Sequence, residues 1–261
     1  MRRDLKGAPG KASVCRGSFG VAEGYSRGDR LDSALPLPAW RRWPPARTRT
    51  SRWPQAPTGE PLVLLGLLAV MLAMSGVSPK DRLTWLLEEA PVFIGVPILV
   101  ATFKRFRLSP LSYRLIFLHA LLLVVGSHYT FSEVPAGFWI QDALGFARNH
   151  YDRLVHFVGG FAPAIVGREI LRRRTPLRSQ GWLSFLVALG CLGGSAFYEL
   201  LEWWAAMLVG AEASAFLATQ GDVWDTQWDM FLGLTGAVMA LLLLSRRHER
   251  ELRAMLAGLP R

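Results

Sequence analysis

Residues 61–77 read PLVLLGLLAVMLAMSGV, an apolar run of 17 residues without a charged side chain. Runs of about 17–25 apolar residues match the ~30 Å hydrocarbon core of a lipid bilayer. Further runs of this kind lie at about residues 83–103, 111–127, 154–171, 182–209 and 226–244. The sequence therefore predicts an all-α, polytopic membrane bundle of about six transmembrane helices over residues 61–245.

The segments that flank these runs are basic. Residues 1–60 are rich in Arg, Pro, Gly and Ser and carry twelve Lys/Arg against five Asp/Glu. This composition predicts a disordered cytoplasmic tail without a secretory signal, and it also fits an overcalled start site. Residues 246–261 are predicted to form a short basic cytoplasmic tail. Beside a membrane domain such tails favour anionic lipid, so we expect the lipid bilayer as partner and no nucleic acid.

Basic residues also set the predicted orientation. Lys and Arg gather in the first tail, in residues 104–114, in residues 168–178 and in residues 246–253. The connections between these segments are poor in them, and residues 210–225 contain none. Short basic segments stay in the cytoplasm, so we expect an even number of spans in the bacterial inner membrane with both termini cytoplasmic.

Acidic and histidine side chains converge at the outer end of this predicted bundle. They form three pairs spaced by three or four residues, so each pair occupies one face of its helix. Ionisable groups inside a membrane are costly and are functional candidates for that reason. The predicted site, with its members as metal ligands or catalytic acid/base groups, consists of Asp152, His156, Glu199, Glu202, Asp225 and Asp229.

A cluster of carboxylates needs a cation, shared protons or an arginine, and Arg148 and Arg153 are the nearest arginines. Histidine with carboxylates suits Zn, Mn or Fe, whereas carboxylates alone suit Mg or Ca, so a divalent metal is the candidate cofactor. Simpler roles compete: Asp222 suits a helix N-cap, and Asp225 and Asp152 suit a first helical turn. Glu88 and Glu89 are expected at the membrane interface, and the arginines of residues 172–174 as a topology signal only.

Glycines interrupt the last three predicted spans. Small residues let membrane helices approach closely, so these spans are expected to pack tightly as the core of the fold. The glycines concerned are Gly159, Gly160, Gly190, Gly193, Gly194, Gly233 and Gly236.

Four segments resemble a known family. HYTFSEVP (128–135), NHYDRLVHFVGGF (149–161), FYELLEWW (197–204) and GDVWDTQWDMFLG (221–233) are similar to the uncharacterised YjdF-type bacterial inner-membrane proteins, over roughly residues 75–245. A looser resemblance extends to the VanZ-like proteins. It covers an Asp-basic-x-x-His-Phe segment (residues 152–157), the two glutamates of residues 199–202 and the aspartates and glycine of residues 222–233. Glu202 and Asp229 depart from that pattern, where Gln and Asn are frequent. Neither resemblance implies an established activity.

Three functional hypotheses follow, and whether the protein is an enzyme stays open among them. The first is an outward-facing site that binds a metal or a polar envelope component, as in a hydrolase or transferase. The second is a small proton- or ion-coupled transporter, against which the inner halves of the helices look largely uncharged. The third is a non-catalytic membrane scaffold whose polar cluster only fixes helix packing.

Overall fold

The computed structural model describes residues 59–210 and 214–257, and within these ranges it contains helices and no strands. This confirms the predicted all-α class. The predicted disorder of the first tail falls on residues that lie, apart from the last two, outside the described ranges. The helices are α1 (Gly59–Ser75), α2 (Arg82–Glu88), α3 (Ala90–Thr102), α4 (Pro110–Tyr129), η2 (Phe131–Glu133), α5 (Pro135–Leu144), α6 (Tyr151–Arg174), α7 (Gln180–Val209), α8 (Ser214–Leu217) and α9 (Asp225–Ala257).

The described helices include four, α4, α6, α7 and α9, that are long and apolar enough to cross a membrane. A fifth span results if α2 and α3, which are bent by 42° at their junction, count as one. Helix α1 is apolar but has only 17 residues, about 26 Å at 1.5 Å per residue. The six predicted runs thus correspond in order to these helices, and the count of six is approximate.

Local sequence explains several helix ends. The Ser109 hydroxyl accepts a hydrogen bond from the Ser112 amide at the start of α4, and the Asp81 carboxylate caps α2 in the same way. The α2–α3 break falls at Glu89, two residues before Pro91, as the proline predicts. Pro97 was also expected to break this span, but it lies inside α3, where only one backbone hydrogen bond has to be given up.

Two helical segments differ from the sequence prediction. Helix α9 was expected to end near residue 244 but continues to Ala257, so most of the predicted C-terminal tail is helical. It continues because His248, Leu252 and Met255 are buried against the bundle. Helix α5 was missed; it ends at Gly145, which adopts the left-handed conformation that glycine favours.

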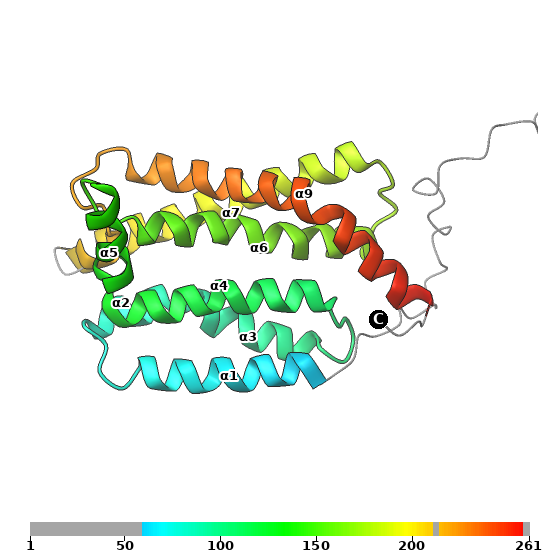
Figure 1. Cartoon of the computed structure of the whole chain (residues 1–261), viewed down its shortest axis with the longest axis horizontal. Helices are drawn as coiled ribbons and strands as arrows, with labels where there is room; N and C mark the ends of the chain where they lie inside the picture. The colour runs from blue at the N-terminus through cyan, green and yellow to red at the C-terminus, as the bar shows by residue number, and fades with distance from the viewer. Residues whose placement is uncertain (1–58, 211–213, 258–261) are drawn as a thin grey trace, which may run out of the picture. The chain divides into compact units, whose positions relative to one another are not determined.

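Helix α6 lies at the centre of the bundle, in contact with α4, α7 and α9, while α1 packs on α4 (Figure 1). Its crossing with α9 is made by glycines. A Cβ at Gly160 would lie 2.8 Å from the Gly233 Cα, and one at Gly236 would lie 3.0 Å from the Phe161 amide nitrogen. This confirms tight packing of α6 on α9, because a side chain at either position would meet backbone.

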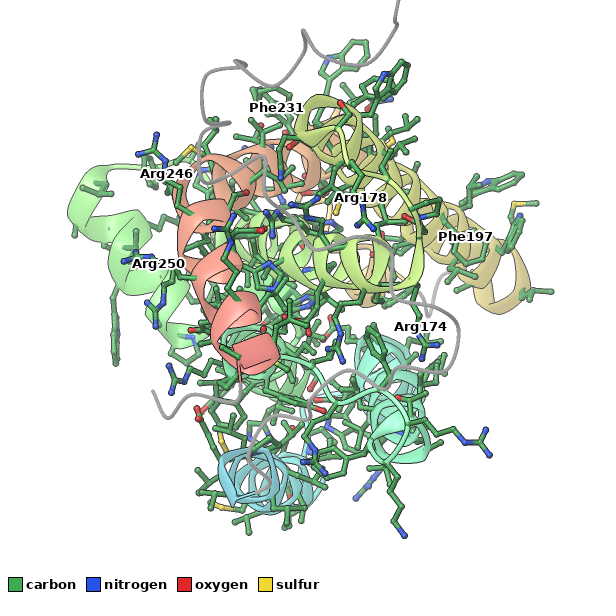
Figure 2. The ribbon with its side chains drawn as sticks, turned by 90° about the vertical axis from the view of Figure 1, so that its right-hand side faces the viewer. Arg174, Arg178, Phe197, Phe231, Arg246 and Arg250 are labelled. Carbon is green, nitrogen blue, oxygen red and sulfur yellow. The ribbon has the colours of Figure 1, made fainter. Side chains whose placement is uncertain are left out.

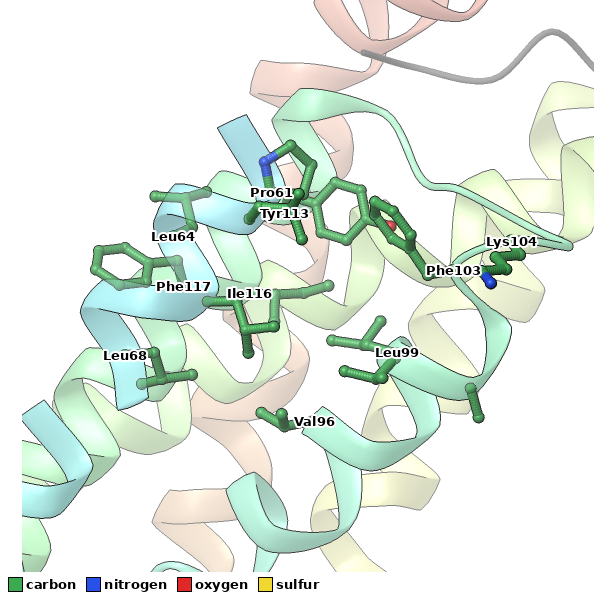
Figure 3. A pocket seen from close by; sticks show the side chains of 14 residues that line it. Pro61, Leu64, Leu68, Val96, Leu99, Phe103, Lys104, Tyr113, Ile116 and Phe117 are labelled. Atoms are coloured by element: carbon green, nitrogen blue, oxygen red, sulfur yellow. The ribbon is translucent and has the colours of Figure 1, made fainter. Parts of the chain in front are cut away.

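The glycines of α7 behave differently. A Cβ at Gly190, Gly193 or Gly194 would meet no atom within 4 Å, so these residues leave space instead of closing a helix contact. A separate apolar cavity of about 270 Å³ lies between α1, α3 and α4, lined by Leu68, Val96 and their neighbours (Figure 3).

Candidate functional site

The site lies at the end of the bundle where α6 and α9 begin and α7 ends, which we call the acidic end. The three helices contribute the paired side chains that the sequence placed on single faces. The α6–α9 glycine crossing lies directly below it, since Gly160 follows His156 by one turn and Gly233 follows Asp229 by one turn. The backbone contact of the two helices therefore sets how closely these polar side chains approach.

His156 stands at the centre of the polar side chains. Its Nε2 lies 3.5 Å from Asp152 Oδ1, and its Nδ1 lies 3.8 Å from Glu199 Oε1. Two sets of three groups have ligand atoms within 4.8 Å of one another: Asp152, His156 and Asp229, and His156, Glu199 and Glu202. The structure thus brings five of the six predicted residues into two adjoining groups that share one imidazole.

Most of these groups are withdrawn from solvent. The exposed fraction is 3% for Asp152 and Asp229, 7% for Glu199 and 9% for His156. Asp229 Oδ1 and Glu199 Oε1 are buried without a hydrogen-bond partner. Buried carboxylate oxygens are costly when unpaired, so these atoms suit a ligand such as a cation or a proton.

Asp225, the sixth predicted residue, faces the two arginines. Arg148 Nη1 lies 2.5 Å from Asp225 Oδ1, and Arg153 Nη2 lies 2.5 Å from Asp222 Oδ2. We call Arg148, Arg153, Asp222 and Asp225 the rim cluster. The Trp224 amide, with Arg153 beside it, lowers the pKa of Asp222 below its usual value. The arginines therefore form their ion pairs with the aspartates near the start of α9.

Glu88 and Glu89 are fully buried inside the protein, while their predicted place at the membrane interface stays a prediction. Glu89 Oε1 accepts a hydrogen bond of 2.6 Å from the Ser127 hydroxyl, and Glu88 Oε1 accepts one from the Phe131 amide. The α2–α3 bend turns both side chains inward. Glu88 interacts electrostatically with Asp152, which extends the acidic end to a fourth helix.

Comparison with known proteins places this arrangement in a family. The model for a family described as "Predicted membrane protein (DUF2238)" matches residues 60–250. The chain belongs to that family. It is also 51% identical over 186 residues to the inner membrane protein YjdF of Escherichia coli (strain K12), an alignment that covers 71% of this chain and 89% of that protein. No solved structure matches the chain significantly. The family and the apolar helices together identify an integral membrane protein, while the VanZ-like resemblance stays a prediction.

A second buried polar cluster lies at the opposite end of the bundle, which we call the basic end. Glu169 is fully buried and accepts hydrogen bonds from the Ser109 amide and from the Ser109 and Ser112 hydroxyls. Arg173 Nη1 lies 2.6 Å from it and His248 Nε2 lies 3.2 Å from it. Sequence reasoning missed this cluster, although the i, i+4 spacing of Glu169 and Arg173 was a signal for it.

The arginines around Glu169 have structural partners as well. Arg168 pairs with Glu249 of α9 at 2.8 Å, and Arg172 lies 3.3 Å from the same carboxylate. Both side chains are almost fully buried. Arg172 thus holds α6 to α9, and Arg173 holds it to the segment before α4 by donating a hydrogen bond to the Arg107 carbonyl. The interpretation of residues 172–174 as a topology signal alone is wrong for these two.

Proposed function

We propose that this DUF2238 chain is an inner-membrane protein whose acidic end binds one divalent transition-metal ion through Asp152, His156 and Asp229. The observation that carries the proposal is the orphaned, buried Asp229 oxygen beside a histidine and a second carboxylate. One imidazole with two carboxylates is a donor set that suits Zn²⁺, Mn²⁺ or Fe²⁺ and leaves further coordination positions open.

Glu199 has a supporting role in this proposal. Metal-bound histidines commonly donate their second ring N–H to a carboxylate, which fixes the tautomer and the ring orientation. In this protein Nε2 of His156 faces Asp152 and Nδ1 faces Glu199, as that arrangement requires. Glu202 lies beyond Glu199 and is not needed as a ligand.

The acidic end faces the periplasm in this proposal, and both termini are cytoplasmic. Support comes from the basic end, across which Arg174, Arg178, Arg246 and Arg250 are distributed (Figure 2). Positive side chains mark the cytoplasmic side of a membrane protein. A bound metal at the periplasmic end supplies Lewis-acid chemistry, so the reaction class is hydrolysis or group transfer on an envelope component.

Elemental analysis of the detergent-purified full chain tests the proposal. We expect about one metal ion per chain, lost in His156→Ala and in Asp229→Asn. His128→Ala is the matched control, because the His128 ring contacts the Ser75 carbonyl away from the site. Glu202→Gln should keep the metal. A metal-free parent protein, or a metal retained in both site variants, would overturn the proposal.

Proton-coupled transport is the second candidate, and a specific observation favours it. The inner halves of the helices looked uncharged in the sequence, but Glu169, His248 and their arginines form a buried polar cluster there. Two results together would favour transport over the metal site. The parent protein would be free of metal, and it would carry a proton flux into vesicles that is lost in His156→Ala.

A further inference from the structure

An apolar furrow leads away from the acidic end along α6. One part, about 530 Å³, lies mainly between α4, α6 and α7, and another, about 480 Å³, lies between α3, α4 and α6. The two parts share His119, Pro163 and Ile170 in their walls and therefore adjoin each other. Each part has a volume typical of ligand pockets, about 300–1,000 Å³.

Glycines on two helices form part of the furrow wall and enlarge the space between them. Gly159 and Gly167 of α6 and Gly190 and Gly194 of α7 all line it. A Cβ at Gly190 or Gly194 would meet nothing within 4 Å, so here the small residues create a slot between helices. The remaining walls are largely aliphatic, which suits a hydrocarbon chain.

The furrow reaches the proposed metal site at His156, which lines its wall. Tyr198 lies beside it, with its ring centroid 6.2 Å from that of His156, and its hydroxyl is buried without a hydrogen-bond partner. An unpaired hydroxyl thus lies where the apolar slot meets the metal site. A polar end beside an apolar slot is the pattern that an amphiphile matches with its head and its tail.

We propose that the furrow binds one hydrocarbon chain of a membrane lipid, whose polar head reaches Asp152, His156 and Asp229. The substrate of the site is then an amphiphilic lipid, not a soluble envelope molecule. The placement of the lipid's polar head rests on the proposed function, while the placement of its hydrocarbon chain rests on the furrow. The slot lies among membrane-spanning helices, so a lipid enters it sideways from the bilayer. The cavity of Figure 3 has no such role, because none of the proposed ligands lines it.

Photo-crosslinking of the full chain in vesicles tests this inference. The probe is phosphatidylglycerol with a diazirine in one acyl chain, mixed into phosphatidylethanolamine vesicles, and adducts are mapped by mass spectrometry. We expect adducts on the furrow residues of α6 and α7, and their loss in the double variant Gly190→Leu, Gly194→Leu. Gly193→Leu is the matched control: it lies on the same helix with the same open surroundings but outside the furrow, so its adducts should persist.

Two results would overturn the inference. Adducts spread evenly over the exposed apolar side chains, with no difference among the variants, would mean that the furrow holds lipid no better than any other surface. Furrow residues without adducts, beside labelled apolar side chains elsewhere on the same helices, would mean that something other than lipid occupies the furrow. Metal content measured on the same samples separates the two proposals. A metal-free parent with furrow adducts refutes only the metal site, whereas bound metal without furrow adducts refutes only the lipid.

Discussion

Gly160→Ala should weaken both the fold and metal binding, because α6 and α9 touch at this residue. The new Cβ would overlap the Gly233 carbonyl oxygen and lie 2.5 Å from the Gly233 carbonyl carbon, whereas ordinary contact begins at 3.4 Å. The helices would therefore have to separate by more than about 0.9 Å. Overpacking of this kind costs about 1–3 kcal/mol. At about 2–4 °C per kcal/mol for a chain of this size, the Tm should fall by roughly 2–12 °C.

The same separation should reach the site one turn away. His156 and Asp229 lie on the two helices that are pushed apart, so their shared ligand geometry widens. Displaced supporting groups weaken metal sites by about 10–100-fold. Thermal unfolding in detergent and metal titration of the same preparation measure the two effects.

Gly193→Ala is the control, since its Cβ meets no neighbour and alanine favours the helix by roughly 0.5–1 kcal/mol over glycine. If Gly160→Ala matched this control in Tm, the glycine contact would not hold α6 against α9. If it matched the control only in metal affinity, the α6–α9 spacing would not control the site.

Three further results are expected. Glu169→Gln should destabilise the protein by about 3–5 kcal/mol in thermal unfolding, because it removes the carboxylate that faces the buried Arg173 guanidinium. The half-buried Glu60, which faces Arg114, is the control, and Glu60→Gln should cost at most about 1 kcal/mol; equal effects would refute the structural role of the basic end. The lowered pKa of Asp222 contributes stability that is present above its unfolded value of 3.8 and is lost as the pH falls through the folded pKa. In Asp222→Asn the Tm should therefore fall less steeply than in the parent protein as the pH is lowered into the acid range. An unchanged dependence of Tm on pH would contradict the ion pair. Alkaline phosphatase fused after Pro176 should be inactive and after Gly221 active, and the reverse pattern would invert the proposed orientation.

The sequence predicted the parts of this fold that depend on local periodicity. Apolar runs located the spans, and i, i+4 spacing placed Asp152 with His156 on one face of a helix. Topology then indicated that three helices would bring these faces to one end. The grouping of five predicted residues around a single imidazole follows from these regularities, while their function stays a prediction.

Other features depend on contacts between distant residues, which one sequence does not reveal. Gly160 and Gly190 look alike in the chain, yet one meets backbone and the other lines open space, because helix rotation decides which face is packed. Glu169 meets His248 across 79 residues, and Asp225 turns to Arg148 across 77. Such pairings arise only once α6, α9 and the connecting loops are in place.

The charges on α6 also matter while the protein is being made. His248, which lies 3.0 Å from Arg168, follows it by 80 residues in the chain. At about 5–20 residues per second, roughly 4–16 s of synthesis separate the two. During that interval Arg168 has no α9 carboxylate beside it. The polar contacts that join α6 to α9 at the basic end can therefore form only after α9 has been made, so they complete the bundle late in its assembly.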